Sequence, residues 1–304
     1  MSVVRMQVGR VVAAAVVVGA VVSGCGGGPS QAGTAVFIGE NAIPLEQVQT
    51  QLDTALSKGD LIARITAQGG STADIARGIV TRAVLHDLFA LRAAEEGIAV
   101  TDAQVDAVIA ENGGADALLD GSLFDLPMLR EIVRDELIAT QLGQRAVAGL
   151  AVTADIVAAT DRAEADAKAA ALQAGGAEAD ALFGDPRTSA RAVTYDAASS
   201  PENASEVLFG VPVGTVVTFQ PDPQQFTWLV ARVVDRRTDA PSDPAVVSGI
   251  SRAQLVAIGE RMVQPTADQV GIRVNPRYGV WDPVQLRIVA EDQRAGTVLP
   301  PVAS

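Results

Sequence analysis

The chain has 304 residues, with 36 Asp and Glu against 23 Lys and Arg, so its formal net charge is −13 at pH 7. So acidic a chain would repel phosphates, which argues against nucleic acid as a partner and against peripheral binding to anionic lipid. A single cysteine excludes an internal disulfide, and the length allows one large or two modest domains with their own cores.

Residues 1–24 are predicted to be a lipoprotein signal peptide. Arg5 and Arg10 precede an apolar stretch of about a dozen residues, too short to cross a bilayer core of roughly 30 Å as a helix. The stretch ends in Val-Ser-Gly-Cys, which resembles the bacterial lipobox. This resemblance implies that Cys25 is lipidated, with palmitate among its acyl chains, and anchors the protein to the extracytoplasmic face of the cell membrane. The alternative is an ordinary signal peptide with a chance cysteine.

Residues 25–34 are rich in small and turn-forming residues and are predicted to be a flexible tether. A helical domain is predicted for residues 35–152. It opens with a β-rich run at 35–39, and a turn leads to Pro44. Apolar residues spaced three and four apart from Leu45 onward then predict an amphipathic helix.

Three more helices are predicted in this domain. The first covers about 71–96 and is ended by Gly97. Thr101 and Gln104 form a capping-box pattern that opens the next helix, and the last starts near Pro127.

An α+β domain is predicted for residues 153–238. A strand near 155–159 is followed by an Ala-rich helix over 162–174. The domain closes with a hairpin whose two strands are predicted at 215–219 and 226–235.

The rest of the chain, residues 239–290, is predicted to complete the helical module with one helix over 245–268, kinked near Pro265, and two short extended runs. Residues 291–304 are polar and end in prolines, which predicts a disordered tail. The fold class expected is therefore mainly α with an α+β insert.

Three stretches together resemble foldases of the SurA and PrsA type. They are AVFIGENAIPLEQVQTQL at 35–52, RAVLHDLFALRAAEEGIAVTDAQVDAVIA at 82–110, and VNPRYGVWDP at 274–283, the last similar to the C-terminus of actinobacterial members. An actinobacterial source also agrees with a composition rich in Ala, Val, Asp and Arg and poor in Lys. The resemblance implies that the first and last helices build one module that binds unfolded exported polypeptides, with a parvulin-like domain between them.

The parvulin-like segment departs from the family pattern at its expected catalytic positions. Parvulins usually carry a His on the first strand and another on the last, where this chain has Asp155 and either Trp228 or Leu229. Its single His is His86, in the helical domain. The resemblance therefore implies a degenerate parvulin-like domain, and no catalytic residues are assigned.

The function expected is that of a membrane-anchored, extracytoplasmic chaperone-like protein, without cofactor, metal or catalysis. It would bind clients in an apolar groove between the N-terminal helices and the helix at 245–268. One alternative is an active peptidyl-prolyl cis-trans isomerase with an altered pocket. The other is a structural lipoprotein that docks to one envelope partner.

The remaining polar candidates have ordinary interpretations. A lone His is expected to pack or to lie at the surface, so His86 is not assigned a function. Glu95 and Glu96 are expected to form a solvated helix end, and acidic clusters such as the one around Glu164 lack metal-ligand spacing. The turn containing Tyr278 is expected to have a packing role, with a binding role for Tyr278 or Trp281 as the alternative.

Overall fold

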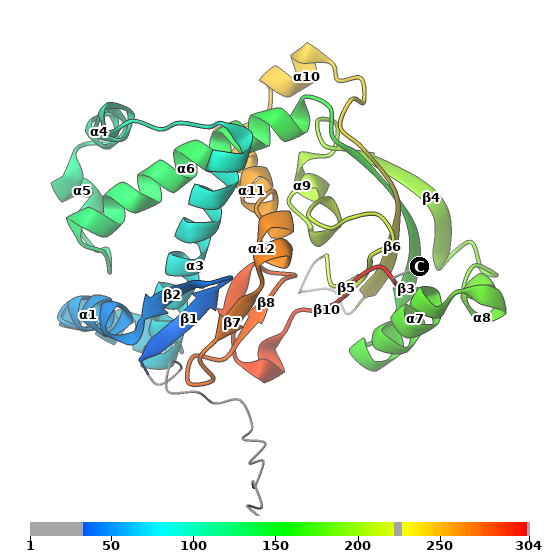
Figure 1. Cartoon of the computed structure of the whole chain (residues 1–304), viewed down its shortest axis with the longest axis horizontal. Coiled ribbons are helices and arrows are strands. Elements are labelled where there is room, and N and C mark those ends of the chain that lie inside the picture. Colours follow the sequence, from blue (N-terminus) through cyan, green and yellow to red (C-terminus); the bar gives the residue numbers. More distant parts are fainter. Residues whose placement is uncertain (1–32, 222–226, 303–304) are drawn as a thin grey trace, which may run out of the picture.

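The structure is a computed structural model that describes residues 33–221 and 227–302. The predicted signal peptide, lipidation at Cys25 and nearly all of the predicted tether lie outside these residues and stay predictions. In Figure 1, a helical part lies on the left and a part built on a large sheet lies on the right, with helices from late in the chain between them.

The first part of the chain is mainly helical. Its elements are β1 (Thr34–Ile38), β2 (Asn41–Pro44), α1 (Leu45–Leu56), α2 (Gly59–Ala67), α3 (Thr72–Glu96), α4 (Asp102–Glu111), α5 (Ala115–Leu119) and α6 (Leu126–Val147). The predicted capping box is present, because the Thr101 hydroxyl accepts the backbone N–H of Gln104. Gly97 ends α3 with φ 64°, a conformation that favours glycine. The sequence pattern missed α2 and α5, both of which are short.

The second part contains a five-stranded antiparallel sheet. Its elements are β3 (Ala151–Ala159), α7 (Arg162–Ala174), α8 (Gly176–Ala181), β4 (Ser189–Asp196), α9 (Pro201–Ala204), the 3₁₀ helix η2 (Val207–Phe209), β5 (Val216–Phe219) and β6 (Trp228–Arg237). The strand order is β10-β5-β6-β3-β4, where β10 (Thr297–Leu299) comes from the end of the chain. Helix α7 covers one face, where Leu172 packs against Val157 and Val230. The strand β3 begins at Ala151, slightly before the predicted start of this domain at 153.

The last part of the chain corrects two predictions. Its elements are α10 (Pro244–Ser248), α11 (Arg252–Arg261), α12 (Gln264–Val270), β7 (Ile272–Val274), β8 (Val280–Asp282), β9 (Arg287–Val289), the 3₁₀ helix η3 (Glu291–Gln293) and β10. The single helix predicted over 245–268 is wrong. Ser251 opens a new helix through a capping box with Gln254, and Pro265 sits in the first turn of another.

The disordered tail predicted for 291–304 is also wrong over residues 291–302. Strand β10 pairs antiparallel with β5, with Val298 opposite Val217. The hydroxyl of Thr218 also accepts the backbone N–H of Thr297 at 2.9 Å. The polar residues at the start of this segment favoured the prediction of disorder, but β10 covers one edge of the sheet.

The two ends of the described chain meet, as predicted. Strand β7 pairs with β1, with Val36 opposite Val274, and β1 also pairs with β2. The side-chain amide of Asn275 donates to the carbonyl oxygen of Thr34 at 3.0 Å. One continuous apolar core includes Val36 from β1 and Ile258 from α11. The architecture is therefore a mainly helical fold with an α+β insert, and the late helices pack against the early ones.

Helices α6 and α11 touch backbone to backbone. A Cβ on Gly259 would overlap the carbonyl oxygen of Ala139, and a Cβ on Gly143 would overlap the carbonyl oxygen of Leu255. Only glycine allows so close an approach at these two positions. The contact fixes α11 firmly against α6, which matters for the surface beside it.

Candidate functional site

An apolar groove with a volume of about 660 Å³ lies between α4, α5, α6 and α11. Ligand-binding cavities in proteins commonly have volumes of about 300–1,000 Å³. Most of the lining side chains are aliphatic: Val108, Leu118, Leu129, Ile132, Val133, Ala253, Val256 and Ala257. The groove lies where the sequence predicts one, between early helices and a helix from the 245–268 segment.

The α6 wall of the groove follows from helical spacing. Leu129, Ile132, Val133 and Glu136 recur at intervals of three and four, so they share one face of the helix. Leu129 and Val133 are buried against α4 in a small apolar cluster with Val105. Ile132 is only half-buried and lines the groove. This helix face is apolar, yet the chain leaves part of it open.

The opposite wall is α11, whose position the glycine contact sets. Val256 and Ala257 line the groove, while the neighbouring Ile258 is fully buried in the main core. One face of α11 therefore packs in the core, and the adjacent face contributes apolar surface to the groove.

Charged residues occupy the rim of the groove. Arg252 of α11 lies 3.7 Å from Glu136 of α6, and both side chains are about half exposed, at 48% and 46%. Helix α4 is tied to α6 by ion pairs of Asp106 with Arg130 and of Asp102 with Arg134. These exposed pairs contribute little stability, but they orient the helices that frame the groove.

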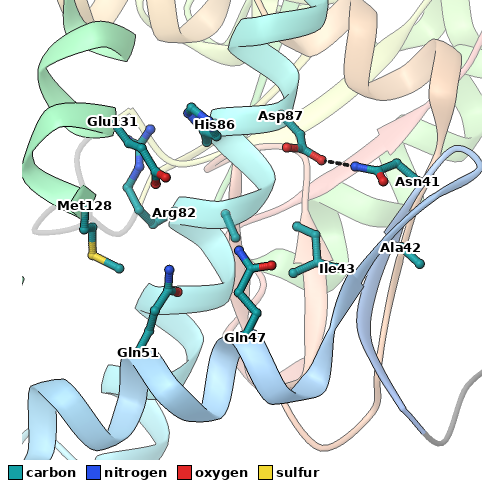
Figure 2. Close-up of a pocket in the computed structure, with 11 residues that line it drawn as sticks. Asn41, Ala42, Ile43, Gln47, Gln51, Arg82, His86, Asp87, Met128 and Glu131 are labelled. Atoms are coloured by element: carbon teal, nitrogen blue, oxygen red, sulfur yellow. Dashed lines mark hydrogen bonds between the residues drawn. The ribbon is translucent and has the colours of Figure 1, made fainter.

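A smaller polar cleft of about 160 Å³ lies between α1, α3 and α6, near the β1–β2 turn (Figure 2). Arg82 and His86 project from α3, and Met128 and Glu131 come from α6. Beside the cleft, the carboxylate of Asp135 is buried, pairs with Arg82, and lies 3.1 Å from Nδ1 of His86. His86 therefore belongs to a polar cluster with Asp135 and Arg82, which its isolated position in the sequence does not indicate.

Burial and nearby acids act in opposite directions on Arg82. Burial lowers the pKa of Arg82, whereas the carboxylates of Glu260, Glu131 and Glu136 raise it. Arg82 therefore links α3 electrostatically to α6 and α11, and we assign the cluster a role in holding these helices together.

The expected parvulin positions are not brought together. Asp155 lies opposite Arg232 across β3 and β6, whereas Trp228 lies opposite Ala159, four residues further along β3. At about 3.3 Å per residue this is a separation of roughly 13 Å along the sheet. Leu229 lies opposite Ala158, beside Trp228.

Asp155 has structural partners of its own. The residue is 5% exposed. Its carboxylate accepts a hydrogen bond from Arg232 at 2.9 Å and the backbone N–H of Ala192 at 3.0 Å. Ala192 has φ 52° and lies where the β3–β4 register shifts, so the carboxylate stabilises a bulge. Trp228 is half-buried and has the guanidinium of Arg162 5.8 Å from its ring centroid.

The other polar candidates are engaged in packing or ion pairs. Glu96 pairs with Arg92 and Arg145, so the expected solvated helix end is part of a salt-bridge group. Glu164 pairs with Lys168 at 2.7 Å. Tyr278 is 4% exposed and its hydroxyl accepts a long hydrogen bond, 3.5 Å, from Gln49. In the described residues, no group of three or more His, Cys, Asp or Glu side chains is arranged to hold a metal ion.

Within residues 33–221 and 227–302, no helix combines the length and the apolar character needed to cross a bilayer.

Comparisons with known proteins give little sequence likeness. No family model matches the chain, and no curated protein matches it. Among solved structures, the foldase protein PrsA from Streptococcus pneumoniae is similar, with 14% identity and a TM-score of 0.24, over 78% of this chain and 92% of that one. The foldase protein PrsA from Lactococcus lactis is similar with 11% identity and a TM-score of 0.25, over 80% of this chain and 95% of that one.

Proposed function

We propose that the protein is a chaperone-like factor that binds unfolded exported polypeptides in the groove between α4, α5, α6 and α11. The observation that carries the proposal is the open row of aliphatic side chains between two helices that otherwise pack backbone to backbone. Burial of apolar client side chains there would be favourable by about 25 cal/mol for each Å² removed from water. Such binding is reversible and needs neither cofactor nor ATP.

The proposal includes anchoring through a lipid on Cys25, which would hold the groove at the outer face of the membrane. It also includes the absence of prolyl isomerase catalysis. The separation of Asp155 from Trp228 and the ion pairs of Asp155 support this part, because isomerisation requires a pocket that desolvates and twists the X-Pro bond.

The test is suppression of aggregation of a defined, chemically unfolded client, followed by light scattering at equimolar protein. A charge in the groove should prevent apolar burial, so Val256→Asp should weaken client binding about tenfold or more. Val246→Asp is the matched control, since Val246 is 43% exposed on α10 and does not line the groove. Equal activity of the two variants would contradict the proposed binding site.

A second assay separates chaperoning from catalysis. Refolding of a proline-limited client should not be accelerated when the protein is present at one-hundredth of the client concentration. Acceleration at that ratio would instead identify an isomerase, and loss of the acceleration in Asp155→Ala would assign it to the sheet domain.

A further inference from the structure

A second cavity, of about 220 Å³, lies at the junction between the helical part and the five-stranded sheet. Three arginines line it: Arg92 from α3, Arg145 from the end of α6, and Arg236 from β6. Glu96 is the one acidic residue of the lining. In a chain with net charge −13, this is a local reversal of charge.

The carboxylates near the cavity are already engaged with two of these arginines. Glu96 lies 2.6 Å from Arg92 and 2.9 Å from Arg145. Glu95 lies 3.1 Å from Arg92 and also accepts the hydroxyl of Thr266 at 3.2 Å. These two carboxylates face three guanidinium groups, so the cluster as a whole keeps one positive charge in excess.

Arg236 is the arginine without a counterion. Its guanidinium donates to the backbone carbonyl of Phe209 at 2.7 Å, and no carboxylate of the described residues forms an ion pair with it. Burial lowers the pKa of Arg236, and the positive charge of Arg92 lowers it further. A desolvated cation next to a like charge is unfavourable, and a bound anion would remove the imbalance.

The rest of the lining restricts which anion fits. Leu142, Ala146 and Leu150 from the end of α6 and the residues after it, with Met262 after α11, form an apolar wall. Inorganic phosphate would lose hydration against such a wall without compensation. A carboxylate attached to an apolar carbon would place its charge at the guanidiniums and its hydrocarbon on the wall.

We propose that this cavity is a binding site for a carboxylate carried on an apolar group, with Arg236 and Arg145 as its cationic partners. The shared chemistry is that of a polypeptide C-terminus and of a small free carboxylic acid. The site spans α3, α6 and β6, so its ligand would also join the helical part to the sheet.

The test is calorimetric titration of the full-length protein with N-acetyl-leucine at low salt. A ligand of this size should bind with a Kd on the order of 1 mM. N-acetyl-leucinamide has the same apolar group without the charge and should bind at least tenfold more weakly. Equal binding of acid and amide would overturn the proposal, as would tighter binding of inorganic phosphate than of N-acetyl-leucine.

Two variants assign the binding to the cavity. Arg236→Gln and Arg145→Gln should each weaken binding of N-acetyl-leucine about tenfold. Arg145 is half exposed, so its variant is expected to fold even if Arg236→Gln does not. Arg187→Gln is the control, because Arg187 is 86% exposed and pairs with Asp185 on the sheet domain. Unchanged binding in Arg145→Gln would contradict the assignment.

The source of the carboxylate is distinguished by a peptide that ends in leucine, compared with its C-terminal amide. Tighter binding of the free-acid peptide than of N-acetyl-leucine supports a polypeptide C-terminus as the ligand. Equal affinity of peptide and amino acid supports a small carboxylic acid. Binding of the amide peptide as tight as that of the acid would overturn both.

Discussion

Helices α6 and α11 meet in two different ways. At Gly143 and Gly259 their backbones touch, and no side chain larger than hydrogen fits between them. Beside that contact, Ile132 of α6 and Val256 of α11 line an open groove. Small residues therefore create a closed, rigid contact, and branched aliphatic residues on the adjacent faces create an unfilled apolar surface. The rigid contact keeps the walls of the groove at a fixed separation.

The largest expected effect comes from Gly259→Ala, which breaks the closed contact. The new methyl group would overlap the carbonyl oxygen of Ala139, so α11 must move away from α6. We expect a loss of about 3 kcal/mol or more in the free energy of unfolding, measured by urea denaturation. Gly78→Ala is the control, and it should change the free energy of unfolding in the opposite direction. Gly78 has open space around it on α3, and alanine there should stabilise by about 0.5–1 kcal/mol.

The next prediction separates the core side of α11 from its groove side. Ile258→Ala should cost about 3 kcal/mol of unfolding free energy, because Ile258 is fully buried. Val256→Ala should cost less than about 1 kcal/mol, since the side chain is already partly exposed, yet it should weaken client binding. A stability loss as large as that of Ile258→Ala would mean that the groove is part of the folding core.

The polar contact between α3 and α6 offers a comparison with the apolar one. Asp135→Asn removes the charge that pairs with Arg82 and should cost about 2 kcal/mol. This is less than the loss of a typical buried ion pair, because Glu131, Glu136 and Glu260 also attract Arg82. Asp87→Asn, at the exposed end of the same cleft, should change stability by less than about 0.5 kcal/mol. Thermal denaturation distinguishes the two variants.

The smallest effect concerns the far end of α11, where Arg261 donates to the carbonyl oxygen of Ser205 at 3.0 Å. Burial raises the pKa of neighbouring Glu206, although Arg261 opposes the change. Because the pKa of Glu206 is higher in the folded state than in the unfolded state, the folded protein favours the protonated carboxyl. The protein is therefore more stable at low pH, and this part of the unfolding free energy is lost as pH rises through the folded-state pKa of Glu206. Glu206→Gln should therefore gain less than about 1 kcal/mol at pH 7 and nothing at pH 3.

The control for this prediction is Glu202→Gln, since Glu202 is exposed on α9. It should leave the pH dependence of stability unchanged. A gain that is the same at pH 3 and pH 7 in Glu206→Gln would contradict an electrostatic cause.

Local patterns in the sequence predicted the long helices and their ends, because caps and periodic apolar residues act over a few positions. Thr101 with Gln104 and Gly97 are examples. The capping box at Ser251 is equally local, and it starts a new helix within the 245–268 segment. Long-range contacts were harder to predict. Nothing near Asp135 in the sequence indicates that Arg82 is its partner. The short segment around Val298 pairs with β5, which lies much earlier in the chain, so a local pattern does not reveal this strand.

Part of the candidate site could also be predicted. The position of an apolar groove between early and late helices was an expectation from the resemblance to SurA-type and PrsA-type foldases, and the amphipathic pattern predicted only the apolar faces of the single helices. The backbone contact that holds the walls of the groove in place was not predicted. A signal for it exists, because a glycine inside a helix costs about 1 kcal/mol relative to alanine and therefore indicates close packing. Gly143 and Gly259 are such residues.

The pairing of β1 with β7 and of β5 with β10 has a consequence for how the chain reaches its final state. The three-stranded sheet cannot be completed before β7 is available, and the five-stranded sheet cannot be completed before β10 is available. Contacts between residues this distant in sequence slow folding, because the entropy of closing a long loop is lost before the contacts contribute any stabilisation. A protein proposed to bind unfolded polypeptides would therefore itself remain incompletely folded until β10 pairs with β5.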